Sequence, residues 1–142
     1  MKKKCTPFLF FVLSFSTFVH AQRQAHTNPP IDSRLYEVYD GGFLDHLKSD
    51  NPFLLQRLNF YLDHAWYLTD LPAEKDSAGY RTITVADLEN INILKIEKEQ
   101  HLAHNWERQT VYKIANTSQA LVFYSGKEFT RQLNEHLGRS TK

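Results

Sequence analysis

The sequence predicts an α+β fold: a two-layer domain with N-terminal helices, an antiparallel β-meander of three to four strands and a C-terminal helix. Three observations support this prediction. Apolar residues between Pro52 and Leu68 recur at helical spacing, and β-branched and aromatic runs begin at Tyr80. A capped amphipathic segment follows Ser125 near the end of the chain. Helices first, strands next and a helix last indicate two packed layers.

The first 21 residues are typical of a signal peptide. A basic start, Lys2 to Lys4, precedes an apolar run over residues 7–19, which is shorter than the ~20 residues that a membrane-spanning helix needs. Val19 and Ala21 are small side chains at the two positions that a signal peptidase reads, so we expect cleavage between Ala21 and Gln22. An uncleaved N-terminal anchor is the alternative, and the abrupt polar boundary disfavours it.

Removal of this leader changes the composition of the chain. It takes 21 of the 142 residues and three of the 17 Lys and Arg residues, which leaves 121 residues, 14 basic and 16 acidic, with a formal charge of −2. This balance disfavours nucleic acid and anionic lipid as main partners. The only cysteine, Cys5, is removed too, and it precedes the apolar run, unlike the acylated cysteine of a lipoprotein. We therefore expect a soluble periplasmic or secreted protein without a disulfide, a cofactor or a transmembrane anchor.

The mature chain is predicted to begin with a flexible or extended polar arm, residues 22–32, followed by a single domain at 33–142. In the stretch "RLYEVYDGGFLDHLKSD", residues 34–50, Gly41 and Gly42 separate two apolar groups. This pattern suits either a helical hairpin or a broken helix.

The next helix is predicted to start at Pro52, whose missing N–H costs nothing in a first turn, with Asp50 or Asn51 as its cap. One face carries the apolar residues Leu54, Leu58, Tyr61, Leu62 and Ala65. The helical pattern extends to Leu68, and Leu71-Pro72 is expected to end the segment.

Four runs after Tyr80 predict strands. They are "YRTITV", "INILKIE", "TVYKIA" and "ALVFYS", at residues 80–85, 91–97, 110–115 and 120–125. The polar "NTSQ" between the last two indicates a hairpin turn. The final helix is expected to start at Ser125, with Glu128 at capping-box spacing and Gly138 as its C-cap. Its apolar stripe comprises Phe129, Leu133 and Leu137 or His136.

The stretch "EKEQHLAHNWERQ", residues 97–109, is the nearest approach to a chemical motif. His101 and His104 are three residues apart, and a zinc site would need a third or fourth ligand. Glu99, Glu107, or the distant Asp63 or His64 are the candidates for that ligand. There is no HExxH, and the stretch is expected to join two strands. A solvated connection therefore explains the two histidines better than a metal site does.

A pair of tryptophans suggests a binding surface instead. "DHAWY" and "AHNWE" each place a Trp two residues after a His, as His64/Trp66 and His104/Trp106. If the end of the helix packs beside the long connection, both indoles contribute to one aromatic patch edged by imidazoles. The alternative is that both tryptophans lie at core edges with their N–H groups satisfied.

Two short segments resemble part of a known family. "DLENINILK", residues 87–95, resembles a strand segment of TonB-dependent receptor plug domains, where an acidic-Ile-Glu-x-Ile-x-Val-Leu-Lys pattern occurs. "ALVFYSGK", residues 120–127, is similar to the apolar strand that follows it there. The likeness covers about a tenth of the chain and lacks both the Gly-rich link between these strands and the receptor barrel. It implies two strands and carries no functional residue over.

Other catalytic motifs are missing from the sequence, which contains no GxSxG and no Gly-rich phosphate loop. Two classes of function remain. The favoured hypothesis is a small exported binding or interaction domain, for example an accessory subunit of a cell-envelope complex, whose partner is another envelope or secreted protein. Its binding residues would be His64, Trp66, His101, His104 and Trp106. The alternative is a small metal-dependent or histidine/carboxylate hydrolase that uses His101, His104 and nearby carboxylates.

Overall fold

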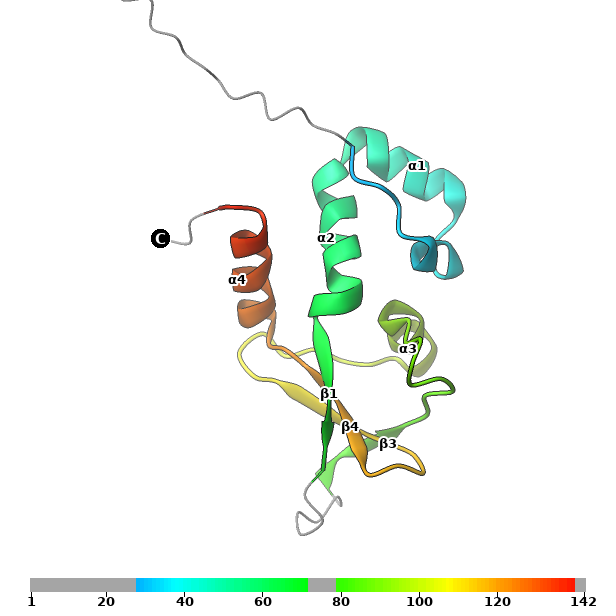
Figure 1. Ribbon diagram of the computed structural model, residues 1–142, viewed down its shortest axis with the longest axis vertical. Helices are drawn as coiled ribbons and strands as arrows, with labels where there is room; N and C mark the ends of the chain where they lie inside the picture. The colour runs from blue at the N-terminus through cyan, green and yellow to red at the C-terminus, as the bar shows by residue number, and fades with distance from the viewer. Residues whose placement is uncertain (1–27, 72–78, 140–142) are drawn as a thin grey trace, which may run out of the picture.

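A computed structural model describes residues 28–71 and 79–139, and it shows an α+β fold, as predicted (Figure 1). In chain order the helices are η1 (Ser33–Glu37, a 3₁₀ helix), α1 (Gly41–Asp50), α2 (Pro52–His64), α3 (Ile93–Gln100) and α4 (Gly126–His136). The strands are β1 (Trp66–Asp70), β2 (Arg81–Ile83), β3 (Thr110–Ile114) and β4 (Gln119–Phe123). The predicted signal peptide, residues 1–21, lies outside the described residues.

The four strands form one mixed sheet in the order β1-β4-β3-β2. β4 pairs antiparallel with β1 and with β3, whereas β2 pairs parallel with β3. The parallel pair follows from the connection, because α3 lies between β2 and β3 in the chain and returns it to the starting end of the sheet. The prediction of a wholly antiparallel meander is therefore wrong at β2.

Residues 91–97 contain the start of a helix rather than a strand, which corrects the prediction for "INILKIE". Asn92 caps α3 by accepting a hydrogen bond from the backbone N–H of Lys95. Ile93 is fully buried, and Ile96 one turn later packs against the same core. Isoleucine at a spacing of three, followed by "EKEQ", is a helical pattern that the β-branched composition concealed.

A second correction concerns the end of α2. The helix ends at His64, and after Ala65 the chain continues as β1, so the predicted helical reach to Leu68 is wrong. Residues 66–70 pair with residues 119–123 of β4 across the whole strand. Tertiary pairing thus overrides a helical pattern that is equally compatible with a strand.

Other local predictions are confirmed. α2 starts at Pro52 with Asn51 as its cap, and β3 and β4 form a hairpin. Ser125 accepts a hydrogen bond from the backbone N–H of Glu128 at the start of α4. One position is corrected: the helical stretch is interrupted at residues 38–40, whereas Gly41 and Gly42 form the first turn of α1, capped by Asp40.

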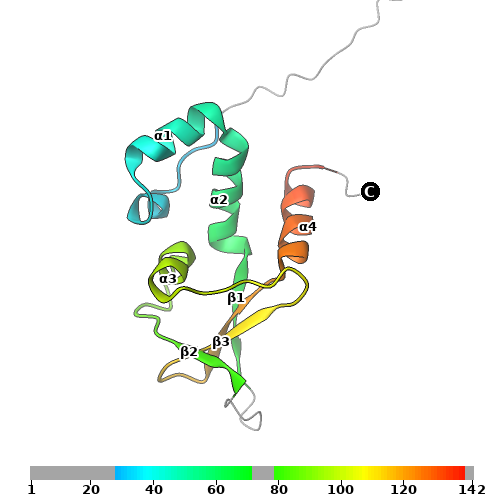
Figure 2. The same cartoon turned by 180° about the vertical axis from the view of Figure 1, so that it is seen from behind.

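One hydrophobic core joins the helices to the sheet. Its fully buried members include Leu35, Leu44, Leu55, Leu62 and Ile83. Figures 1 and 2 show α3 and α4 on opposite sides of α2, which runs directly into β1. A smaller cluster of Phe60, Ala65, Phe129 and Leu133 joins α4 to the end of α2. None of the described helices is long and apolar enough to cross a membrane.

The last residues of the predicted arm are attached to α2. Asn59 donates from its side chain to the carbonyl of Pro30 at 2.6 Å and accepts from the backbone N–H of Asp32 at 3.2 Å. Arg34 binds both Asp32 and Asp63, and these hydrogen bonds lower the pKa of each carboxyl. Pro30 and Asp32 are thus bonded to the domain ahead of η1, which starts at Ser33.

Candidate functional site

The stretch containing the two histidines connects α3 to β3 and is held against the domain at two points. The hydroxyl of Tyr112 donates to the carbonyl of Ala103 at 2.8 Å and accepts from its N–H at 2.9 Å. Further along, the carbonyls of Asn105 and Trp106 accept hydrogen bonds from the N–H groups of Gly126 and Lys127. The connection is therefore tied both to β3 and to the first turn of α4.

His104 belongs to a polar cluster between α2 and α3. The Tyr61 hydroxyl donates to Glu97 Oε1 at 2.7 Å and lies 3.1 Å from His104 Nε2. His104 Nε2 also contacts the same Glu97 oxygen. Because an ionised carboxylate only accepts, we infer that Nε2 carries the hydrogen. The ring also packs edge-on against Phe123, at 4.5 Å between centroids.

The electrostatics of this cluster favour a neutral tyrosine. Burial raises the pKa of Tyr61 well above its ordinary range, and the negative charge of Glu97 raises it further. Glu97 is itself mostly covered, with 14% of its side chain exposed. His104 Nε2 thus helps to hold α2, α3 and the connection together.

His101 lies apart from this cluster. It is the C-cap of α3 in the left-handed conformation, with φ 50°, and is exposed. Its carbonyl accepts a hydrogen bond from Arg81 at 3.2 Å. In the described parts of the chain, no three His, Cys, Asp or Glu side chains converge as metal ligands would.

Trp106 is the most exposed large apolar side chain of the described residues, with 58% of its surface accessible. It lies against Gly126, where an added Cβ would come within 2.4 Å of the indole Cε3. Only glycine at this position lets the ring rest on the start of α4.

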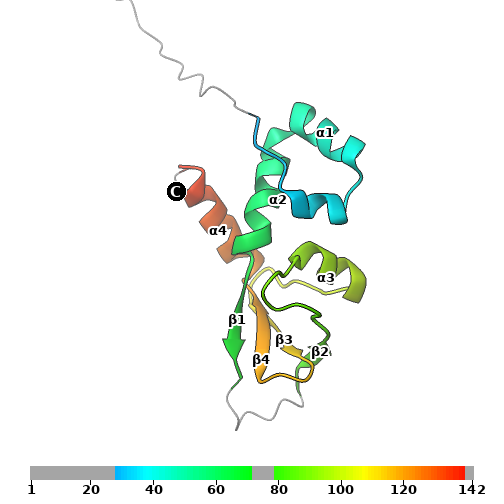
Figure 3. The same cartoon turned by 45° about the vertical axis from the view of Figure 1, so that its right-hand side comes forward.

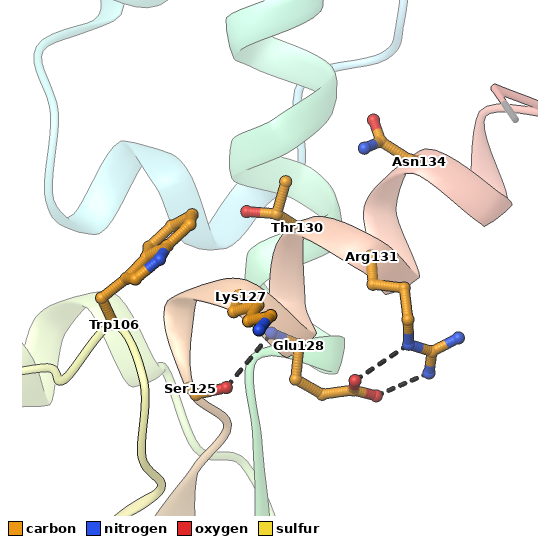
Figure 4. Close-up of a pocket in the computed structure, with 7 residues that line it drawn as sticks. All are labelled: Trp106, Ser125, Lys127, Glu128, Thr130, Arg131 and Asn134. Carbon is orange, nitrogen blue, oxygen red and sulfur yellow. Dashed lines mark hydrogen bonds and ion pairs between the residues drawn. The ribbon is translucent and has the colours of Figure 1, made fainter. Parts of the chain in front are cut away.

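Two clefts border Trp106. The larger, about 420 Å³, runs along α4 and is lined by Trp106, Ser125, Lys127, Glu128, Thr130, Arg131 and Asn134. Figure 4 shows the indole at one end of this cleft and the Glu128–Arg131 pair at the other. The smaller, about 200 Å³, is more apolar and is lined by Arg57, Tyr61, Ala65, His104, Trp106, Tyr124, Gly126 and Phe129. The indole of Trp106 thus lines both clefts.

The larger cleft carries fixed charges of both signs. Arg131 binds Glu128 at 2.6 Å and also binds Glu135. The hydrogen bond from Arg131, with a second from Gln132, lowers the pKa of Glu128 to about 2. The rim of the cleft is therefore an ordered set of ionised groups at neutral pH.

The other two predicted residues lie elsewhere. Trp66, in β1, donates its indole N–H to the carbonyl of Leu62 at 2.7 Å and packs on the core. His64 stacks on Phe60 at 4.2 Å between centroids, near His136 of α4. Of the five predicted residues, the structure brings only His104 and Trp106 to the same cleft.

Sequence reasoning did not identify Tyr61 and Glu97 as partners of His104, nor the α4 residues of the larger cleft. Tyr61 lies 43 positions from His104, and no spacing rule links them. Glu97 was inside the quoted stretch, but its role depends on the chain turning back at His101. Glycine at 126 beside the helix cap was the one available signal for a closely packed neighbour.

Comparison of this chain with protein-family models, with curated proteins and with solved structures finds no match.

Proposed function

We propose that this protein is a small exported binding domain whose partner surface is centred on Trp106. The observation that carries the proposal is the exposed indole fixed between two clefts by Gly126. A protein that inserts an apolar side chain into the smaller cleft would contact Trp106 and Phe129 there. Its polar groups would meet Lys127 and Arg131 along α4. Rigid aromatic anchors beside a polar rim are the usual source of binding energy in protein interfaces.

The partner is expected to be another envelope or secreted protein, because the sequence begins with a predicted signal peptide. Export is testable by itself. N-terminal sequencing of the protein purified from cells that express the full chain should begin at Gln22. Recovery of an intact Met1 from the membrane fraction would support the uncleaved anchor and contradict this prediction.

Site-specific photocrosslinking in cells tests the proposed surface. A photoreactive residue in place of Thr130 or Asn134, which line the larger cleft and leave Trp106 in place, should give one discrete crosslinked partner, identified by mass spectrometry. Tyr36, on η1 and 52% exposed, provides a matched control position that should give none. Equal crosslinking from all three positions, or from none, would contradict the proposal.

The hydrolase alternative rests on the contact between Glu97 and His104. Metal analysis of untagged protein, beside the His101→Ala/His104→Ala double variant, distinguishes the two functions. Stoichiometric zinc that is lost in the double variant would favour the metal-dependent hydrolase. Protein that carries no zinc but crosslinks from position 130 would favour the binding domain.

A further inference from the structure

Among the residues that the structure describes, β1 forms one edge of the sheet and pairs with β4 only (Figure 3). The carbonyl of Ala65 accepts from the N–H of Tyr124, and the N–H of Leu71 donates to the carbonyl of Ser118. Because backbone bonds alternate along an antiparallel pair, Tyr67 and Thr69 also bond inward to β4. The N–H and C=O groups of Trp66, Leu68 and Asp70 consequently point away from the sheet.

At the opposite edge of the sheet, formed by β2, backbone groups are bound by side chains. At the end of β2, the side-chain amide of Gln100 accepts from the N–H of Thr84 at 3.0 Å and donates to its carbonyl at 2.5 Å. Arg81 in turn binds the carbonyls of Gln100 and His101. These contacts bind the end of α3 to that edge and partly cover it. β1 contains no proline and no lysine, which are common means of protecting an edge.

We propose that two copies of this chain pair through β1, antiparallel, about a two-fold axis at Leu68. In this register Leu68 faces Leu68 of the second copy, and Trp66 faces Asp70. Each of the outward-facing residues both donates and accepts one backbone hydrogen bond across the axis. The two sheets become one continuous sheet, and the interface is isologous.

The sequence of β1 fits a second copy of itself. "WYLTD" places its only charge, Asp70, at one end, so the two-fold separates the carboxylates and sets each beside a tryptophan. On the other face of the strand, Tyr67 meets Thr69 of the second copy, and aromatic–threonine pairs across strands are favourable. No like charges oppose one another within these five residues. No residue that lines the two clefts at Trp106 belongs to β1, so dimerisation goes beyond the proposed binding function.

Sedimentation equilibrium of the exported protein, purified after cleavage of its leader, with a matched pair of variants tests the dimer. Asp70→Pro removes one outward N–H and leaves the inward bonds at Thr69 and Leu71, while Asp70→Ala keeps the N–H and removes only the carboxylate. We expect twice the chain mass at about 100 μM for the wild type and for Asp70→Ala, but a monomer for Asp70→Pro. A monomeric wild type, or a dimer that Asp70→Pro leaves intact, would overturn the proposal.

Residue-resolved amide hydrogen exchange provides a second measurement that needs no variant. The amides of Tyr67 and Thr69 should be protected at every protein concentration, because they bond to β4. The amides of Trp66, Leu68 and Asp70 should gain at least tenfold protection as concentration rises through the dimerisation range. The dimer proposal would be contradicted if the protection of these three amides did not depend on protein concentration. Fast exchange of all three at every concentration would contradict it too.

Discussion

The two halves of the connection between α3 and β3 differ in how their ring-bearing side chains are placed: the first is packed against the domain, and the second is exposed. In the first half, His104 lies against Phe123, Tyr61 and Glu97, and Ala103 is bonded to Tyr112. In the second half, Trp106 is held by its backbone and by Gly126 but leaves most of its indole exposed. The imidazole of His104 is therefore packed within the fold, whereas the indole of Trp106 is exposed. The presence of histidines in a sequence does not by itself locate a functional site.

The largest expected loss of stability is in the first half of the connection, which Tyr112 holds against β3. Tyr112→Phe removes the hydroxyl that bonds both backbone groups of Ala103, and we expect a loss of about 2 kcal/mol in the free energy of unfolding. Urea denaturation measures it. Tyr67→Phe is the control, since its hydroxyl lies 3.5 Å from Gln109 on the surface. Equal losses in both variants would contradict the anchoring role.

Substitution of His104 or His101 is expected to change the free energy of unfolding by less than Tyr112→Phe does, and by different amounts. His104→Ala removes the ring from Phe123 and leaves the Tyr61–Glu97 pair without its third member, for a loss of about 1.5 kcal/mol. His101→Asn, which suits the left-handed C-cap, should change stability by less than about 0.5 kcal/mol. Thermal and urea unfolding compare the two. A larger loss at His101 would reverse the assignment.

Alkaline pH tests the same cluster. The folded pKa of Tyr61 is raised, so its stabilising effect is fully present below the ordinary pKa near 10 and declines as pH rises beyond it. Between pH 8 and pH 11 the wild type should lose about 1.4 kcal/mol more than Tyr61→Phe. Urea unfolding at the two pH values gives the difference. Parallel losses in the two proteins would show that Tyr61 ionises freely in the folded state.

The exposed half should respond least in stability and most in binding. Trp106→Ala is expected to change the unfolding free energy by less than about 0.5 kcal/mol and to abolish the partner crosslink from Thr130. Gly126→Ala displaces the indole and should shift its fluorescence in a Trp66→Phe background. Gly79→Ala, with open space around its Cβ, is the control. An unshifted spectrum in Gly126→Ala would show that the ring does not rest on α4.

Local signals predicted much of this fold. The cap and proline at the start of α2, the hairpin turn before β4 and the cap of α4 each depend on neighbouring residues, and each is found. α3 and β1 were missed for physical reasons. Isoleucine suited a strand at residues 91–97, and "WYLTD" continued a helical pattern until pairing with β4 decided otherwise.

The candidate site was harder to predict than the fold. The sequence singled out Trp106 because an indole follows a histidine in a polar connection. It did not indicate that Trp66 bonds to Leu62 and packs on the core, because that depends on where α2 stops. The smaller cleft forms only once α4 lies beside α2, so its residues share no sequence pattern.

The positions of the two tryptophans have a consequence for the order of folding. Trp106 reaches its place when the β3–β4 hairpin closes and α4 begins, which are contacts between segments near in the chain. Trp66 is in place only when β1 pairs with β4, at Phe123, across most of the domain. Since closing a longer loop costs more entropy, the signal of Trp106 should settle first in refolding. Stopped-flow traces of the two single-tryptophan proteins would therefore time the hairpin and the long-range strand separately.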